Sequence, residues 1–304
     1  MGLPTHRVDR PDQFLTGQAI IEMATEAEAA GFDAVFVTEH PIPGDAWLAS
    51  GGHHALDPFV VLSVVAAATT RLRLHTNLMI AAYRNPYLLA KTIASLDVVS
   101  GGRLIAGIGT GYLEAEFAAL GVDFAERNEL TDEALVAMKD VWRGSSVDFS
   151  GRHFTAAANT ALPRPVQQPH PPLWIGGNSR RAIRRAVELG DGWAPMPNPA
   201  RSARRRHSPP LETVDDLRRG VEYARAHGEV VGRAKPLEIV FIPLGLDMLS
   251  AGGYEPAAML AGIAELEEAG VTYLVVSFPA ETRAGFCQEL ARFGQEVIAV
   301  ATPR

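Results

Sequence analysis

Two adjacent glycines and two small polar residues stand between a short apolar run and an amphipathic pattern. The apolar run ends at Ile175, and the residues that follow are Gly176, Gly177, Asn178 and Ser179. Glycine lets backbone N–H groups approach a ligand closely, and serine can cap a helix whose free amides and positive dipole end face the same point. This strand, turn and helix arrangement predicts an anion pocket, most simply a phosphate pocket.

Arg180 and Arg181 occupy the first turn of the expected helix. The helix dipole disfavours cations at that end, so a bound anion close by would explain the two arginines. The alternative is an ordinary strand-to-helix turn with solvated arginines, because a glycine turn alone is a weak motif.

Short apolar runs alternate with helical patterns along the whole chain, as in βα units around a parallel sheet. Eight such units predict an α/β fold in the form of a closed (β/α)₈ TIM barrel, with an open doubly wound sheet as the alternative. The first expected strand begins at Leu3, and the others cover residues 34–38, 72–78, 103–108, 173–175, 192–196, 237–244 and 271–278.

Residues 143–171 break this alternation with a small hairpin around residues 147–154 and a proline-rich connector. We expect this segment to be an insertion between the fourth and fifth barrel units. The remainder of the chain then forms a single domain that spans residues 1–304.

The active site of such a barrel lies at the carboxyl ends of its strands. Polar residues and glycines gather at those ends, in Glu39-His40, Thr76-Asn77, Gly109 to Tyr112, Gly176 to Ser179 and Trp193 to Pro197. This clustering strengthens the case for the anion pocket. Trp47 and Trp193 are candidates to wall a substrate pocket, although aromatic residues at a barrel mouth serve as core packing about as often.

Composition restricts the class of protein. The 304 residues are 47% hydrophobic and carry a net charge of −7, which gives no reason to expect a nucleic-acid partner. A single cysteine, Cys287, excludes an intrachain disulfide and a multi-cysteine metal site. The adjacent His53 and His54 lack a metal-ligand pattern, and no apolar run is long enough to span a membrane. We therefore expect a cytoplasmic protein without a metal site.

Three separate segments carry a resemblance to a known family. GFDAVFVTEH, YRNPYLLAKTIASLDVVSGGRLIAGIGTGY and PVQQPHPPLWIGGNSRRAIRRAVELGDGW resemble the bacterial-luciferase-like family of flavin and deazaflavin oxidoreductases. The similarity is closest to the branch that depends on coenzyme F420 and covers roughly residues 31–197. It implies a barrel with an insertion and a flavin-like cofactor across the mouth, with its phosphate over Gly176, Gly177 and Asn178.

The same resemblance implies a role for the second strand end. His40 matches a histidine that lies against the reactive ring, and Glu39 beside it is expected to tune or orient the imidazole. Histidine can exchange a proton near neutral pH, although a histidine in this position is often only a satisfied polar residue. Thr76, Asn77 and Leu78 fall where the family has a non-prolyl cis peptide, which we expect between Asn77 and Leu78.

Further positions complete the expected cofactor site. Thr110, Gly111 and Tyr112 match residues that reach the phosphate and side chain of the cofactor, and Ile175 and Ser179 flank the phosphate turn. Relatives with a sugar-phosphate substrate have an acidic residue in place of Tyr112, which argues against that activity here. Four arginines could hold the oligoglutamate tail of F420, or belong to a solvated loop: Arg201, Arg204, Arg205 and Arg206.

The function expected from this resemblance is hydride transfer between F420 and a small organic substrate, by a homodimer. An FMNH₂-dependent monooxygenase that inserts oxygen from O₂ is the alternative, because the same phosphate pocket serves FMN. A cofactor-holding protein without turnover and a metal- or sugar-phosphate-handling barrel without a flavin are two further alternatives, and the latter would need ligands that the sequence does not provide.

Overall fold

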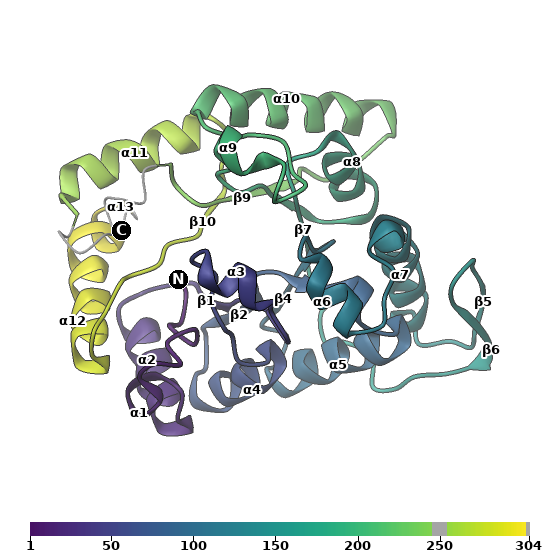
Figure 1. The fold of residues 1–304 in the computed structure, drawn as a ribbon, viewed down its shortest axis with the longest axis horizontal. Coiled ribbons are helices and arrows are strands. Elements are labelled where there is room, and N and C mark those ends of the chain that lie inside the picture. Colours follow the sequence, from purple (N-terminus) through teal and green to yellow (C-terminus); the bar gives the residue numbers. More distant parts are fainter. Residues whose placement is uncertain (245–253, 302–304) are drawn as a thin grey trace.

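A curled parallel β-sheet lies at the centre of the molecule (Figure 1). The structure, a computed structural model, describes residues 1–244 and 254–301. Within these residues the strand order is β1-β2-β4-β7-β8-β9-β10, and β3 also pairs with β4. The strands of this sheet are β1 (Ala34–Val37), β2 (Arg73–Thr76), β3 (Met79–Ile80), β4 (Leu104–Gly109), β7 (Leu173–Gly176), β8 (Gly192–Ala194), β9 (Glu238–Phe241) and β10 (Tyr273–Leu274).

The apolar composition of the strands follows from burial on both faces of the sheet. Every residue of β1, β4 and β7 is buried, as a parallel sheet covered by helices requires. Along β1, Ala34 and Phe36 belong to one apolar cluster, whereas Val35 and Val37 belong to another. The two clusters therefore lie on opposite faces of the curled sheet.

The first three residues join the two edges of this sheet. The N–H of Leu3 donates to the carbonyl of Phe36 in β1 at 3.0 Å, and the N–H of Gly2 donates to the carbonyl of Val276 beyond β10 at 2.9 Å. Gly2 also forms a parallel bridge with Phe36. The strand expected at Leu3 is thus an isolated bridge, but it lies between the strands that a first barrel strand would join.

A series of helices packs around the outside of the sheet (Figure 1). α12 packs on α2, α2 on α4, α4 on α5, α5 on α7, α7 on α8 and α8 on α10. The helices are α2 (Gly17–Ala29), α4 (Pro58–Ala68), α5 (Pro86–Val99), α7 (Arg127–Trp142), α8 (Arg180–Leu189), α10 (Val214–Val230), α11 (Pro256–Glu268) and α12 (Arg283–Phe293). This succession follows the expected alternation of strands and helices.

Short elements occupy the connections and ends of the chain. They are α1 (Pro11–Phe14), α3 (Asp45–Ala49), η1 (Ala81–Tyr83), α6 (Glu114–Ala119), η2 (Phe124–Glu126), α9 (Ala200–Ala203), η4 (Gly294–Ile298) and α13 (Ala299–Ala301). The expected hairpin is present as antiparallel strands β5 (Val147–Ser150) and β6 (Thr155–Asn159), which lie between α7 and β7 in the chain.

Several elements differ from the sequence-based expectation, among them the three that follow. The third expected strand stops at Thr76, and pairing with β4 resumes at Met79. The last strand contains only Tyr273–Leu274, although the N–H of Val275 still donates to the carbonyl of Phe241 at 2.9 Å. The connection after Met196, expected as an irregular loop, contains the short helix α9.

Candidate functional site

The predicted site residues follow strands that are neighbours in the sheet. His40 comes after β1, Leu78 after β2, Thr110 after β4 and Gly177 after β7, and these strands pair in that order. Because the strands are parallel, their carboxyl ends share one edge. The sheet thus brings the residues to one side of the molecule, as the sequence predicts.

Leu78 lies in the middle of this edge. The peptide bond between Asn77 and Leu78 is cis, which confirms the expected position. A Cβ atom placed on Gly176 would lie 2.0 Å from Leu78 Cδ1, and one on Gly109 would lie 3.4 Å from Leu78 Cβ. The glycines at the ends of β4 and β7 therefore make the space that the Leu78 side chain fills.

Thr76 does not have a free hydroxyl for a ligand. Its Oγ1 accepts a hydrogen bond from the N–H of Gly107 and donates one to the carbonyl of Gly107, both at 3.0 Å. The residue is fully buried. Its contribution to the site is to fix β2 against β4, just before the cis peptide.

His40 sits in a group of aromatic rings. Its ring centroid lies 4.4 Å from that of Trp47, 4.9 Å from that of His53 and 6.2 Å from that of Tyr112. Trp47 belongs to α3, so the long loop after β1 folds back over the strand end that carries His40. These contacts agree with the proposed place of Trp47 beside the site.

Glu39 and His40 do not act as a pair, which corrects one sequence-based expectation. Glu39 accepts hydrogen bonds from both terminal nitrogens of Arg84 and from the N–H of Ile80. His40 Nδ1 instead lies 3.4 Å from Glu116 Oε2. Successive residues of an extended segment point to opposite sides, so two neighbours at a strand end rarely face the same group.

Glu116 and Tyr83 lie beside His40 or its partner, and neither is predicted from the sequence. Glu116 belongs to α6, is 1% exposed, and accepts a hydrogen bond from Tyr83 Oη at 3.0 Å. One signal was available, since Leu113, Glu116 and Phe117 have the spacing of a buried helix face. An acidic residue on such a face points to a special role.

His53 is brought next to His40, although the sequence suggested only a loop histidine. Its Nε2 lies 3.2 Å from Thr38 Oγ1. Burial, followed by the neighbouring charges of His40 and His6, lowers the pKa of His53 to about 4. His53 is therefore neutral at neutral pH and contributes a hydrogen-bonding ring rather than a charge.

The glycine turn has the strand-turn-helix form and the capped helix that the sequence predicts. Gly177 has φ +110°, a conformation that favours glycine, and the side chain of Ser179 caps α8 by accepting from the N–H of Ala182. The N–H of Asn178 donates to Ser208 Oγ at 3.3 Å. Ser208 Oγ thus accepts the N–H of the turn, in a position where a phosphate oxygen could accept it instead.

The side chain of Asn178 serves the fold rather than the pocket. Its amide donates to the carbonyls of Met196 and Pro209 and accepts from the N–H of Met196. It therefore ties the glycine turn to the segment after β8. Only the backbone of Asn178 can contribute to the anion pocket in this arrangement.

Trp193 and Ile175 are buried, and neither side chain faces a ligand. Trp193 is 1% exposed and donates from Nε1 to the carbonyl of Gly177 at 2.8 Å. It therefore supports the glycine turn from the core and does not form a wall of a substrate pocket. Ile175 is 1% exposed and belongs to the core between sheet and helices. It positions the turn through the backbone of β7.

Thr110 and Gly111 follow β4 in a tight bend. Gly111 has φ +77°, and a Cβ atom there would lie 2.6 Å from Phe117 Cε2. The bend therefore requires glycine, and it directs the next residue, Tyr112, toward His40. Burial raises the pKa of Tyr112, so its hydroxyl stays protonated at neutral pH.

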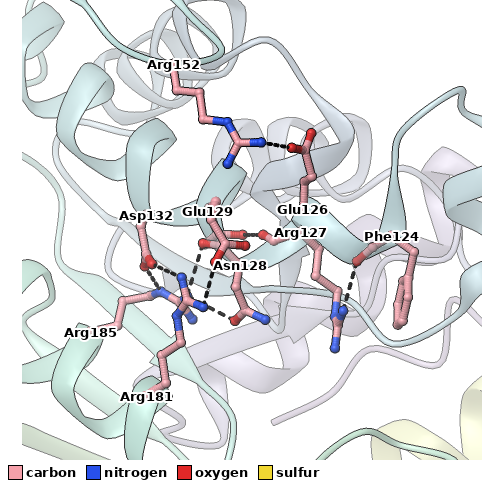
Figure 2. A network of polar contacts seen from close by, with 10 residues as sticks. Phe124, Glu126, Arg127, Asn128, Glu129, Asp132, Arg152, Arg181 and Arg185 are labelled. Atoms are coloured by element: carbon pink, nitrogen blue, oxygen red, sulfur yellow. Dashed lines mark hydrogen bonds and ion pairs between the residues drawn. The ribbon is translucent and has the colours of Figure 1, made fainter.

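Arg180 and Arg181 do not face the anion pocket, which is a second correction. Arg181 forms ion pairs with Glu129 at 2.9 Å and Asp132 at 2.7 Å, and the guanidinium of Arg180 lies over the ring of Tyr223. Figure 2 shows Arg181 and Arg185 directed at the acidic residues of α7. Arg181 and Arg185 join α8 to α7, and Arg180 packs on α10, so neither Arg180 nor Arg181 needs a bound anion to explain it.

The arginines after β8 are partly anchored. Arg205 donates to Ser50 Oγ at 3.1 Å, and Arg206 donates to the carbonyl of Pro197 at 3.3 Å. The segment that carries them thus contacts the loop after β1. Their role toward a cofactor tail stays a prediction.

A cavity of about 710 Å³ lies away from these residues, between β10, α11 and η4. Apolar side chains such as Met259, Ile263 and Val297 line it, and none of the predicted site residues does. Within residues 1–244 and 254–301, no group of three or more His, Cys, Asp or Glu side chains is arranged to hold a metal ion. No helix in those ranges has both the length and the apolar character to cross a bilayer.

The donor set at the strand ends fits a phosphate-bearing flavin or deazaflavin. The backbone of the Gly177 turn and the first-turn N–H groups of α8 can bind a phosphate. His40 and Leu78 lie along the same edge, where a planar ring would meet an apolar side chain and a proton-exchanging group. Glu116 Oε1 is buried and lacks a hydrogen-bond partner among the described residues, as in a site that is completed by another molecule.

Comparisons with known proteins agree with this geometry. The model of the luciferase-like monooxygenase family matches residues 3–227. An uncharacterized protein of Mycobacterium tuberculosis is 33% identical over 184 residues, 56% of this chain and 65% of that protein. The F420-dependent glucose-6-phosphate dehydrogenase of Microbacterium testaceum is 30% identical over 178 residues, 57% of this chain and 51% of that enzyme. The chain thus spans between about half and two thirds of the length of these curated relatives.

Solved structures share the fold at low sequence identity. The monooxygenase RslO1 from Streptomyces bottropensis superimposes with a TM-score of 0.78 at 20% identity, over 99% of both chains. An F420-dependent secondary alcohol dehydrogenase in complex with an F420-acetone adduct superimposes with a TM-score of 0.74 at 18% identity, over 95% of this chain and 96% of that one.

Proposed function

Because the chain belongs to the luciferase-like monooxygenase family, we propose that it is an oxidoreductase that transfers hydride between coenzyme F420 and a small organic substrate. One observation carries this proposal above the others. His40, the cis peptide before Leu78 and the Gly177 turn all follow neighbouring strands and share one edge of the sheet. Similarity to an F420-dependent dehydrogenase at 30% identity supports the choice of cofactor.

Each group at this edge has a part in the proposed site. When bound, the deazaflavin supplies a ring that accepts or donates a hydride. Backbone N–H groups at Gly177 and in the first turn of α8 would hold its phosphate, and Leu78 would support the ring. His40 would exchange the proton that accompanies the hydride, and the rings of Trp47 and Tyr112 would shield the mouth from water.

The fold, the cellular location and the oligomeric state of the enzyme are also proposed. We infer a single (β/α)₈ barrel domain over residues 1–304, with an insertion at about residues 143–171 that contains the β5–β6 hairpin. Residues 245–253 and 302–304 of that domain lie outside the described residues. The enzyme would be a cytoplasmic homodimer, and its net charge of −7 argues against a nucleic-acid partner.

A second candidate is an FMNH₂-dependent monooxygenase that inserts oxygen from O₂ into a small organic substrate. The observation that favours it is the close structural match to the monooxygenase RslO1. The phosphate turn would serve FMN as well as F420, so the two candidates differ in the ring that the site prefers.

Separate titrations with F420 and FMN, followed by quenching of cofactor fluorescence, distinguish the candidates. We expect tighter binding of F420. A preference for FMN would overturn the first candidate in favour of the second, and binding of neither would contradict both. A panel of secondary alcohols with F420, and of the matching ketones with reduced F420, then reports turnover through the absorbance of the cofactor.

A further inference from the structure

A buried carboxylate lies beside one ring nitrogen of His40, Nδ1. The side chain of Glu116 is 2% exposed, and its Oε2 lies 3.4 Å from His40 Nδ1. The same oxygen accepts the hydroxyl proton of Tyr83 at 3.0 Å. Within the described residues His40 Nε2 makes no hydrogen bond, so the two nitrogens of this ring have different surroundings.

Packing alone does not account for an acidic residue at this position. Glu116 shares its helix face with the buried Leu113 and Phe117, where an apolar residue would avoid the cost of burying a carboxylate. Its Oε1 has no partner among the described residues, and a half-satisfied buried polar group destabilises a fold. The destabilising burial of this carboxylate is better explained by its interaction with His40.

The other groups that face His40 cannot supply a compensating negative charge. On one side are Trp47 and His53 of the loop after β1, and the pKa of His53 is lowered to about 4, so this ring is neutral near pH 7. On another side, the ring of Tyr112 faces His40, and Tyr83 contacts Glu116. Burial raises the pKa of both tyrosines, so their hydroxyls remain protonated. Two cations, Arg206 and Arg205, act on this group through their field on Tyr112. Glu116 is thus the acidic group that His40 contacts among the described residues.

We infer that Glu116 is a positioning residue for His40: its carboxylate accepts the Nδ1–H, so that the neutral ring keeps its proton there and offers Nε2 to the substrate. This inference rests on the proposed role of His40 as the proton-exchanging group. With an alcohol substrate, the hydroxyl proton passes to His40 Nε2 and the electron pair of the O–H bond forms the carbonyl. Bound F420 would supply the acceptor for the hydride of the adjacent C–H bond, so that the substrate would be oxidised and the cofactor reduced. The carboxylate stabilises the imidazolium that results, as the acidic partner does in other carboxylate-histidine pairs.

The test uses the protein without cofactor, labelled with ¹⁵N-histidine, and long-range ¹H–¹⁵N correlation spectra that distinguish the two imidazole tautomers. The His40 signals are those that disappear in His40→Gln. We expect the Nδ1-protonated tautomer in the wild-type protein. In Glu116→Gln we expect the titration midpoint of these signals to move to lower pH by about one unit, because the protonated ring loses its charged partner.

Two further variants control this measurement. Glu114→Gln changes an exposed carboxylate on the same helix and should leave the His40 signals unchanged. Tyr83→Phe removes a donor from Glu116, so the carboxylate binds the protonated ring more strongly and the midpoint should move to higher pH. This opposite shift tests the inference even if Glu116→Gln does not fold, which far-UV circular dichroism reveals. An Nε2-protonated ring in the wild-type protein, or an unchanged midpoint in both variants, overturns it.

The outcome is separable from that of the proposed function, because the spectra need no cofactor. If F420 fails to bind while the tautomer and shifts are as expected, the proposed function fails and the pairing of Glu116 with His40 stands. Where turnover is measured, Glu116→Gln should lower kcat by about 10- to 100-fold with the KM for F420 unchanged. A rise in that KM without a change in kcat would show that Glu116 only shapes the cofactor pocket.

Discussion

Arg84 donates hydrogen bonds from both terminal nitrogens of its guanidinium to the two carboxylate oxygens of Glu39. Glu39 follows β1 and is 5% exposed, whereas Arg84 ends the short helix η1, so the pair joins two of the segments that surround the site. Glu39 also accepts the N–H of Ile80 at 2.7 Å. Glu39, the residue before His40, thus fixes the end of β1 to the segment that contains Ile80 and Arg84.

Removal of Arg84 should destabilise the fold. In Arg84→Gln the buried carboxylate of Glu39 loses its charged partner, which we expect to lower the free energy of unfolding by about 3 kcal/mol. Urea denaturation measures the change. Arg225→Gln, at an exposed arginine of α10, is the matched control and should leave the stability unchanged. Equal stability of the two variants would contradict the role given to the pair.

A side chain at Gly177 should block the phosphate pocket. Gly177 has φ +110°, and a Cβ atom there would lie 3.1 Å from that of Ala182, so Gly177→Ala must move the turn. We expect the affinity for F420 to fall by about tenfold or more, because the backbone can no longer approach the phosphate. Gly121→Ala shares the positive φ, at +70°, but has open space around it. If both variants bind F420 as the wild-type protein does in the fluorescence titration, the pocket lies elsewhere.

Truncation of His40 should separate binding from chemistry. We expect His40→Ala to keep its affinity for F420 within about tenfold and to lose about 10²- to 10⁴-fold in turnover, the range for loss of a group that exchanges protons. His54→Ala, at an exposed histidine of the same loop region, should behave as the wild-type protein. Persistent turnover in His40→Ala would show that another group exchanges the proton.

Acid should destabilise the protein partly through His53. Its pKa in the folded protein is about 4, below the ordinary value of 6.5, so the unfolded chain binds more protons between these pH values. Stability is therefore fully present above about pH 6.5 and is lost as the pH falls toward 4. His75, with its pKa lowered by burial to about 3, adds to the loss in the same direction.

The variant His53→Gln keeps a polar side chain near Thr38 and removes one of these titrations. Urea denaturation at a series of pH values should show a smaller loss of stability between about pH 6.5 and 4 than in the wild-type protein. His75 remains in both proteins, so part of the loss should persist. Identical pH dependence of the two proteins would mean that His53 does not titrate with a lowered pKa.

The sequence predicted the framework of the site because each signal was local. Continuous apolar runs such as residues 34–37 identified buried parallel strands, and Ser179 was recognised as the cap of the helix that became α8. The position of the cis bond came from the resemblance, and the bond between Asn77 and Leu78 confirms it. Since parallel strands share one carboxyl edge, the order of strands and polar residues along the chain was enough to group these strand ends.

The partners of individual side chains could not be predicted in the same way. Glu39 turns toward Arg84 and not toward His40, because adjacent residues of an extended segment face opposite sides. Arg181 pairs with acidic residues of α7 whose proximity depends on how the two helices pack.

Contacts between distant parts of the chain also leave no local pattern. Trp193 lies within β8, near the carboxyl end of the strand, yet its ring supports the glycine turn from the core. Glu116 lies 76 residues after His40, the histidine that it contacts, so no spacing in the sequence joins the two. Such pairs depend on how the loops after β1 and β4 fold over the sheet.

The structure of the protein with bound F420 is the most direct test of the account. It should show the phosphate within hydrogen-bonding distance of the backbone N–H groups of the Gly177 turn and of the first turn of α8. The deazaflavin ring should lie against Leu78 with His40 Nε2 turned toward it. A cofactor bound at another part of the molecule, or a ring with His40 on the far side of the sheet, would contradict the proposed oxidoreductase site.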